Sequence, residues 1–532
     1  MYKNFKNPMI VTKAFVIMLS LLIGLPACSD SDSDDGNGGG QNADNTEITI
    51  IPERTKMLRN PLNGWVLYTG LGDGLSDTFW ETYDNFDSSK GKVKVSDYAT
   101  TLYIRAAWSL FNPEEGLYVW DEACNTVAAR RFRFLVKGAE ERNLKLAFTF
   151  IVDSRDKSFN FTPDFVKNAA GIEGFTSGTN GSRWSPYPDN PVFQKYFEKF
   201  IADFAAKYDN PDVTEFVSGF GLGLWGEGHS MIYSTGNASP RESVFNWAVD
   251  LYTKYITKVP LIINYHRCIL TTGGFTDTPN ADSERLLKSA VDKGYSVRHD
   301  AFGMKGYYKE WERAFAVGMR YKRPIIAEGG WVKNSHGNSI KGDGYANYAD
   351  VRRGEFSDAK EAQANMLDFR YSSDIANGET YSWFNEAYSL VEQFIAEGGY
   401  RLYPNTISLP EEVKNGSTIT ITHRWSNLGW GYCPTNIPQW KDKYKVAFAL
   451  LDKNSDVKHI FIDDVPELCE WISGYPKSYT FSPNISGVTA GEYVWAVGLV
   501  DTTKNNEIGI QISAKGDITA GGWLKLTEVT VY

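Results

Sequence analysis

Two glutamates stand directly after the most apolar strand-like segments of the sequence. Glu227 follows an apolar and glycine-rich run at 217–225, and Glu328 follows the short apolar run 324–327. A carboxylate at the end of a buried strand is costly to bury unless it is paired or used. Glycine on both sides of Glu227, and after Glu328, lets other groups approach closely. The two carboxyl groups are therefore the leading candidates for a proton donor and a nucleophile that act together.

The elements that must position these glutamates alternate between strand-like and amphipathic helical segments. Such alternation predicts βαβ units and a parallel sheet, and eight units are typical of a (β/α)8 TIM barrel. A doubly wound open sheet is the alternative, but the glycine-rich stretch 70–74 lacks the dinucleotide-binding spacing. The expected strands are 64–71, 101–107, 145–152, 217–225, 261–265, 295–299, 324–327 and 379–383.

Active sites of TIM barrels lie where the strands end and the following loops begin. The ends of strands four and seven face each other across the barrel mouth, so Glu227 and Glu328 can approach to the roughly 5–5.5 Å used in double-displacement chemistry. The alternative is that either glutamate forms a salt bridge with Arg105 or Arg298 below the site. The residues that we expect to bind substrate follow the other strands or Glu328: Arg105, Trp108, Asn264, His266, His299, Asp300, Trp331 and Trp383.

These positions resemble those of clan A glycoside hydrolases, which carry an acid/base Glu after strand four and a nucleophilic Glu after strand seven. The segment 103–120 is also similar to family 35 and 42 β-galactosidases, where a strand ending in Arg or Trp precedes Pro-x-Glu-Gly-x-Tyr-x-Trp. The matching residues are Glu115, Gly116, Tyr118 and Trp120. The resemblance implies a retaining glycosidase for β-linked oligo- or polysaccharides, with Glu227 as acid/base, Glu328 as nucleophile and no cofactor or metal. Trp383 is similar to the clan's Trp that floors the sugar subsite.

One position departs from the clan. Gly226 stands where the clan usually has the Asn that holds the sugar 2-hydroxyl. Asn264 or His266 could supply another donor. The alternative is a non-catalytic glycan-binding surface lipoprotein with a degenerate barrel. A third reading is another hydrolase or lyase that uses His299 and Asp300.

The region after residue 400 has a different pattern. Short alternating runs at 418–422, 444–450, 493–499 and 526–531 are separated by turn residues. This pattern predicts an antiparallel β-sandwich over 401–532, after a catalytic barrel over 51–400. We expect the sandwich to stabilise the barrel, and sugar binding is the alternative role.

The N-terminus has the features of an export signal. Lysines precede a short apolar run at 14–25, which ends at Cys28 after a small residue. Residues 1–27 therefore read as a signal peptide, and Cys28 resembles the acylated cysteine of a lipobox. The acidic and glycine-rich residues that follow predict a flexible tether over 28–50. They also resemble the signal that sends lipoproteins of Bacteroidetes to the outer membrane and the cell surface.

Composition limits the partners of the chain. The formal net charge is -10, without a long basic stretch, which argues against nucleic acid. No further apolar stretch is long enough to span a bilayer, so the lipid would be the only membrane anchor. Aromatic residues make up 14% of the chain, including 16 Trp. Core packing accounts for most of them, and the remainder fit a carbohydrate partner.

Overall fold

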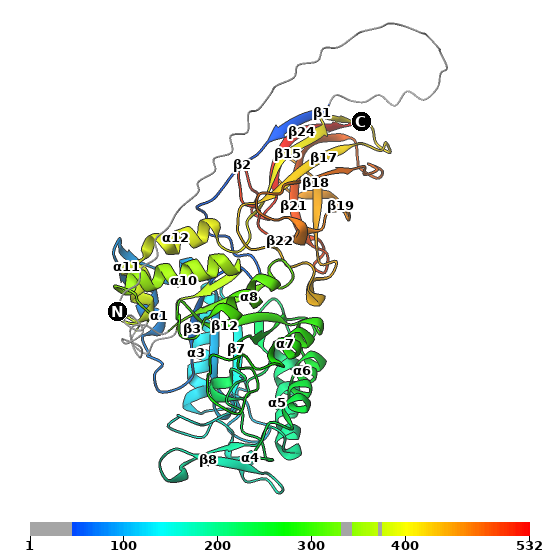
Figure 1. The fold of residues 1–532 in the computed structure, drawn as a ribbon. Coiled ribbons are helices and arrows are strands. Elements are labelled where there is room, and N and C mark those ends of the chain that lie inside the picture. Colours follow the sequence, from blue (N-terminus) through cyan, green and yellow to red (C-terminus); the bar gives the residue numbers. More distant parts are fainter. Residues whose placement is uncertain (1–44, 331–342, 371–374) are drawn as a thin grey trace, which may run out of the picture. The chain divides into compact units, whose positions relative to one another are not determined.

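The computed structural model describes residues 45–330, 343–370 and 375–532 (Figure 1). Eight parallel strands close into a barrel in which each strand neighbours the next barrel strand along the chain. This arrangement confirms the predicted (β/α)8 fold. The strands are β3 (Gly64–Thr69), β6 (Ala99–Ala107), β7 (Lys145–Ile151), β10 (Thr214–Ser218), β11 (Leu261–Asn264), β12 (Ser296–Phe302), β13 (Ile325–Gly329) and β14 (Met366–Asp368).

Helices follow the strands and lie along the outside of the barrel (Figure 1). In α5, the Asn190 side chain accepts hydrogen bonds from the backbone of Val192 and Phe193, and Pro191 occupies the first turn. Its phenylalanines at helical spacing are buried against the strands, as the sequence predicts. The longer helices are α3 (Val127–Glu141), α5 (Pro191–Tyr208), α6 (Arg241–Tyr255), α7 (Ser283–Asp292), α8 (Glu310–Met319), α10 (Tyr348–Ala362), α11 (Glu379–Glu386) and α12 (Tyr388–Glu397).

Shorter elements occupy the loops between barrel strands. The segment between β7 and α5 contains a short helix and a two-stranded hairpin, and we call residues 154–190 the insert. The short elements are α1 (Phe79–Asp84), β4 (Phe86–Ser88), β5 (Gly91–Val93), α2 (Trp108–Phe111), α4 (Asp164–Lys167), β8 (Gly174–Ser177) and β9 (Arg183–Pro186). Among the described residues, no helix combines the length and apolar character needed to cross a bilayer.

Two predicted strands differ from the structure. The fourth strand ends at Ser218, because Gly221 and Gly223 have positive φ angles that take the chain out of the ladder. The eighth strand is β14, whereas the predicted segment 379–383 lies in helix α11. A buried strand of three residues has no periodicity to detect. The aromatic and β-branched residues of 379–383 favour a strand locally, but their packing in the core decides for a helix.

The C-terminal region is a sandwich of two sheets, as predicted. One sheet has the order β1 (Asn45–Thr49), β15 (Leu402–Pro410), β17 (Ile421–Asn427) and β20 (Lys477–Phe481). The other contains β16 (Glu412–Val413), β24 (Leu524–Val531), β21 (Gly491–Asp501), β18 (Tyr444–Leu451), β19 (Val457–Asp463) and β22 (Glu507–Ile510). All pairs are antiparallel except β16 with β24.

The sandwich also recruits residues from before the barrel. Residues 45–49 form β1, which pairs with β15, and β2 (Ile51–Pro52) pairs with β23 (Ala514–Lys515). Residues 45–49 of the expected tether (28–50) and residues 51–52 of the expected barrel domain (51–400) therefore belong to the sandwich. The alternating exposure along β1 shows the usual one-sided burial of an edge strand.

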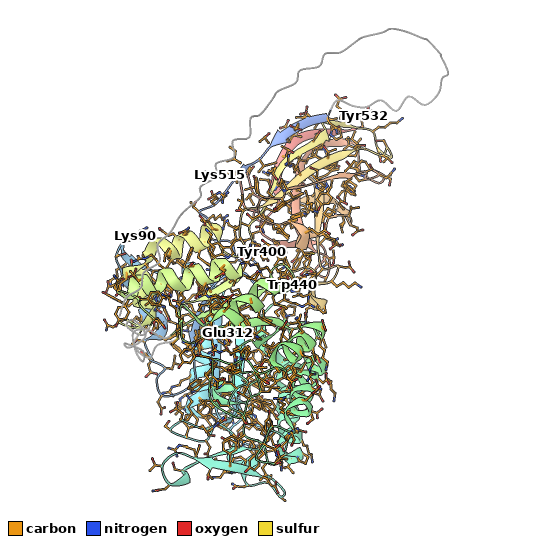
Figure 2. The ribbon with its side chains drawn as sticks, in the orientation of Figure 1. Lys90, Glu312, Tyr400, Trp440, Lys515 and Tyr532 are labelled. Atoms are coloured by element: carbon orange, nitrogen blue, oxygen red, sulfur yellow. The ribbon has the colours of Figure 1, made fainter. Side chains whose placement is uncertain are left out.

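The inside of the barrel and the sandwich share one hydrophobic cluster, while the layer between the barrel strands and helices forms another. Buried residues in the barrel interior, such as Val66 and Phe216, belong to the same cluster as Trp425 and Phe448 of the sandwich. Tyr400 lies between these two groups of strands (Figure 2), and its hydroxyl donates to the carbonyl of Pro61 at 2.7 Å. These contacts involve the amino ends of the barrel strands. The carboxyl ends of the strands are not covered by the sandwich.

Candidate active site

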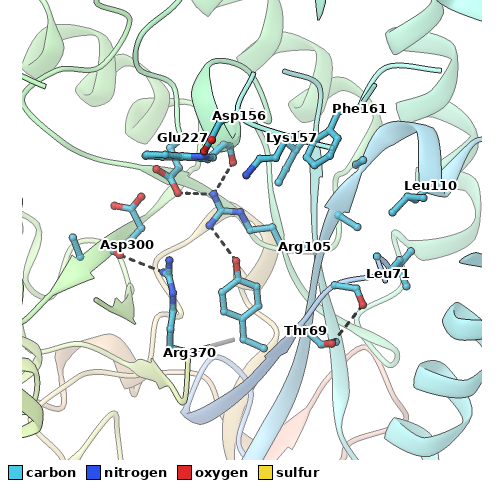
Figure 3. Close-up of a pocket in the computed structure, with 18 of the residues that line it drawn as sticks. Thr69, Leu71, Arg105, Leu110, Asp156, Lys157, Phe161, Glu227, Asp300 and Arg370 are labelled. Carbon is cyan, nitrogen blue, oxygen red and sulfur yellow. Dashed lines mark hydrogen bonds and ion pairs between the residues drawn. The ribbon is translucent and has the colours of Figure 1, made fainter. Parts of the chain in front are cut away.

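A cavity of about 610 Å³ lies at the carboxyl ends of the barrel strands. Figure 3 shows charged side chains on one side of it and apolar side chains on the other. Its lining includes Tyr68, Arg105, Asp156, Lys157, Phe159, Phe161, Trp225, Glu227, Phe275, His299, Asp300, Tyr307 and Arg370. The volume is that of a small-molecule site, and the mixture of aromatic walls with a few polar groups is typical of one.

Glu227 lies in the wall of this cavity and is only 6% exposed. It follows a tight turn at Leu224–Gly226 in which Trp225 has a φ of 56°. Its carboxylate accepts a hydrogen bond of 2.5 Å from Nη2 of Arg105, and Nε2 of His229 lies 3.4 Å away. The turn places Glu227 beside Arg105 and His229. It does so with Trp225 in the left-handed region, a backbone strain that is common at functional sites.

The same turn explains the glycine at position 226. Gly226 has a φ of 77°, and a Cβ at this position would lie 3.4 Å from Gly221. Most side chains avoid this backbone conformation. Glycine at position 226 is therefore explained by the backbone conformation of this turn.

Glu227 and Asp300 form a carboxyl–carboxyl hydrogen bond. Burial raises the pKa of Glu227, and the negative charge of Asp300 adds to the rise against the opposing pull of Arg105. Burial alone would also raise the pKa of Asp300, but the hydrogen bond from Glu227 holds it well below its usual range. The two pKa values are therefore driven apart, which favours Glu227 as the proton donor and Asp300 as the anion.

Glu328 occupies the end of β13 with 0% exposure and does not line the cavity. It forms ion pairs with Arg298 and Arg370, and Nη1 of Arg105 lies 3.5 Å from its Oε1. The salt-bridge alternative drawn from the sequence thus describes the surroundings of Glu328 correctly. Its carboxylate is available to substrate only if one of these guanidinium groups moves.

Arg105 connects the two glutamates. Its two terminal nitrogens contact Glu227 and Glu328 separately, so one guanidinium lies between the carboxyl groups. Nη1 also donates to the Tyr68 hydroxyl at 3.2 Å, and Nη2 to the Trp225 carbonyl at 2.6 Å. With its donors directed by four groups, Arg105 is fixed as a rigid fork.

Two of the predicted histidines are buried next to the carboxyl pair. Nε2 of His266 contacts the Glu227 carbonyl at 2.8 Å, and burial lowers the pKa of His266 to about 3, so the ring is neutral and donates this hydrogen bond. Nδ1 of His299 accepts from the backbone of Ala301 at 3.1 Å, which leaves the proton on Nε2. Burial also lowers the pKa of His299, whose ring lines the cavity.

The other predicted substrate-binding residues divide by location. Asn264 is buried and accepts from Arg298 at 3.2 Å, below the cavity. Trp108 is fully buried against phenylalanines of α5, and Trp383 packs edge-on against Trp65. These two tryptophans do not line the cavity, which corrects the expectation that they stack on sugar. Trp331, like Cys28, lies outside the described residues.

Several cavity residues escaped the sequence analysis. Arg370 follows β14 by two residues, so a correct eighth strand would have identified it as a strand-end residue. Phe275 and Tyr307 come from loops without any periodic pattern. Lys157 and Phe161 belong to the insert after β7. The length of this insert is the only feature of the sequence that indicates a role for them at the cavity. Within the described parts of the chain, no three His, Cys, Asp or Glu side chains are grouped to hold a metal ion.

Comparisons with known proteins return distant likenesses in structure alone. No family model matches the sequence, and no curated protein matches it. Endo-glycoceramidase II from Rhodococcus sp. aligns over 81% of this chain and 99% of its own, with 11% identity and a TM-score of 0.39. An exo-β-1,4-mannosidase from Opitutaceae bacterium strain TAV5 aligns over 60% and 55%, with 11% identity and a TM-score of 0.36.

A glycoside hydrolase family 5 enzyme from Prevotella bryantii B14 aligns over 65% of this chain and all of its own, with 14% identity and a TM-score of 0.32. None of these three proteins is named a β-galactosidase. At these identities and TM-scores, the likenesses assign no activity to this chain.

Proposed function

We propose that this protein is a glycoside hydrolase that cleaves β-linked carbohydrate with retention of configuration. The observation that carries the proposal is the position of Glu227 in the cavity wall, where the single guanidinium of Arg105 joins it to Glu328. A carboxylic acid beside a carboxylate is the pair that glycosidic cleavage requires. The raised pKa of Glu227 suits a group that must donate a proton near neutral pH.

In the proposed mechanism, a Glu328 oxygen attacks the anomeric carbon while Glu227 transfers its proton to the departing glycosidic oxygen. The bond from Glu328 to the sugar is then cleaved by water, which Glu227 deprotonates. Because Glu328 is completely buried, the Arg370 side chain has to leave it when substrate binds. The resemblance of segment 103–120 to β-galactosidases makes β-galactosides the first compounds to test.

Two variants of the purified protein test this assignment in a screen of polysaccharides and oligosaccharides with product analysis. We expect Glu227→Gln and Glu328→Gln each to lower turnover by about 10²-fold or more, since each removes a group that reacts. Full activity in either variant would refute its assigned role. The anomeric configuration of the first product reports retention or inversion.

A second candidate is supported by the complete burial of Glu328 under three guanidinium groups. If these ion pairs keep Glu328 from the substrate, one alternative is that the barrel binds a glycan without cleaving it. The other alternative is that Asp300 and His299 carry out the reaction. Binding of oligosaccharides with no product after long incubation would favour the first of these. A severe loss in Asp300→Asn with mild losses in both Glu variants would favour the second.

The place of action is also a proposal. We propose that Cys28 is acylated and that the protein is carried to the outer membrane, exposed at the cell surface. The lipobox-like end of the apolar run and the acidic residues after Cys28 support this. Metabolic labelling with a fatty acid should mark the wild type but not Cys28→Ser, and protease treatment of intact cells should remove the protein.

A further inference from the structure

The cavity contains a lysine that the proposed mechanism does not use. Lys157 belongs to the insert and lines the cavity close to Arg105 (Figure 3). Its backbone carbonyl accepts from Nε of Arg183 at 2.9 Å, which helps to fix this part of the insert. The ammonium group lies 5.9 Å from the ring centre of Phe161 and forms no hydrogen bond or ion pair with any residue that the structure describes.

The other buried charges of the cavity have partners. Arg105 is paired with Glu227 and Glu328, Arg370 is paired with Glu328, and Asp300 accepts a hydrogen bond from Glu227. The neighbouring Asp156 is exposed, and its carboxylate does not reach Lys157 within ion-pair distance.

The protonated form of Lys157 is therefore destabilised by its surroundings. Burial lowers the pKa of this lysine, the negative charge of Asp156 opposes that shift, and the nearby charge of Arg105 adds to it. A partly desolvated ammonium without a direct ion-pair partner is unfavourable, whereas an anion supplied by a ligand would reduce the penalty. Lys157 and Glu227 line the same cavity, so a ligand held by the lysine would lie in the cavity on which Glu227 acts.

We propose that the cavity binds an acidic sugar whose carboxylate or sulfate ester pairs with Lys157. This inference rests on the proposed function and narrows its substrate class. The apolar side of the cavity, with Phe159, Phe161 and Phe275, can pack against the CH faces of the sugar ring while its charged group reaches the lysine. Both kinds of acidic group present oxygen acceptors that an ammonium recognises as a point charge.

Equilibrium binding of monosaccharides to the intact protein tests the inference without requiring turnover. The probes are galacturonic acid and galactose 6-sulfate, each compared with galactose at low ionic strength. We expect at least one acidic sugar to bind about tenfold or more tightly than galactose, and added salt to reduce the difference. The probe that shows the preference distinguishes a carboxylate from a sulfate ester.

Substitutions in the insert show whether Lys157 is responsible. Lys157→Gln should abolish the preference for the acidic sugar, and Lys157→Arg should keep most of it. Lys167→Gln removes an exposed lysine of the same insert that does not line the cavity, so it should leave the preference unchanged. A preference that survives in Lys157→Gln would overturn the inference.

The same measurements separate this inference from the proposed function. Equal binding of charged and neutral sugars would overturn the acidic-sugar site but leave the hydrolase proposal intact. A preference for acidic sugars that depends on Lys157, without cleavage of any glycan, would support the site and refute the hydrolase.

Discussion

The carboxyl groups of Glu227 and Asp300 form a hydrogen bond in the wall of the cavity. The pKa values of the two groups are driven apart, with Glu227 raised and Asp300 lowered. A pair of carboxyl groups whose pKa values are separated by their environment can divide the roles of acid and anion between them.

The first prediction concerns the pH dependence of turnover in Asp300→Asn. The negative charge of Asp300 raises the pKa of Glu227, so its removal lowers that pKa. Since Glu227 acts while protonated, activity should be lost at lower pH in the variant than in the wild type. The measurement is the alkaline limb of kcat/KM against pH.

Asp156→Asn is the matched control, because it removes an exposed carboxylate from the same cavity. Its alkaline limb should coincide with that of the wild type. An Asp300→Asn profile that also coincides with the wild type would show that the carboxyl pair does not set the pKa of Glu227.

The second prediction concerns the stability of Glu328→Gln. This carboxylate is the partner of Arg298 and Arg370 in a buried site, and its removal leaves their charges poorly compensated. Breaking a buried ion pair on one side costs about 3–5 kcal/mol of unfolding free energy. Urea unfolding followed by circular dichroism gives the value.

Glu392→Gln provides the comparison for this loss. Glu392 pairs with Lys90 at 2.7 Å, and both side chains are about half exposed. A surface pair of this kind contributes about 1 kcal/mol or less. Equal stability of the two variants would mean that solvent or a rearranged arginine compensates the loss of Glu328.

The third prediction concerns Glu355, a buried carboxyl paired with Arg352 at 2.6 Å. Burial raises the pKa of Glu355 to about 8 from an ordinary value of 4.5. The folded state thus holds a proton that the unfolded state releases, and the stabilising contribution present below pH 4.5 is lost as the pH rises to about 8.

Glu355→Gln should remove this pH dependence. Between pH 5 and 8 the unfolding free energy of the wild type should fall relative to that of the variant, by up to about 1.4 kcal/mol per pH unit. Denaturant titrations at a series of pH values test this. Parallel curves for the two proteins would contradict the assigned pKa.

The fourth prediction concerns cooperativity. Because the barrel interior and the sandwich belong to one core cluster, we expect them to unfold in a single calorimetric transition. Asn365→Ala removes side-chain hydrogen bonds to the carbonyls of Leu62 and Tyr432, at 3.1 and 2.9 Å, and should lower the midpoint of that one transition. Two separate transitions in the wild type would show that the parts are independent.

Sequence patterns identify the barrel well because most of its units repeat a strong alternation of strand and helix. They fail at β14, where three residues are too few for a period, and this error hides Arg370. Glu227 can be singled out from the sequence because it follows the fourth predicted strand. Its pairing with Asp300 depends on how two distant loops meet, which no local pattern contains.

Burial also limits what the sequence can show about aromatic residues. Trp108 and Trp383 follow the expected positions in the chain, yet both are packed into the hydrophobic core. A tryptophan near a strand end can turn toward the core or toward the cavity, and the choice depends on tertiary packing. The cavity instead takes its aromatic wall from loops, including Phe275 and the phenylalanines of the insert.

The pairing of β1 with β15 means that the barrel is inserted into the sequence of the sandwich domain. Thr49 and Thr406 are register partners in adjacent strands, so the chain leaves the sandwich and returns to it about one strand spacing, roughly 5 Å, away. The whole barrel is thus an insertion between two neighbouring strands of one sheet. Domains whose ends lie this close can be inserted into or removed from a host fold with little disturbance of its path. A different barrel could be joined to the sandwich at this one place in the chain, provided that it also matched the hydrophobic cluster that the two parts share.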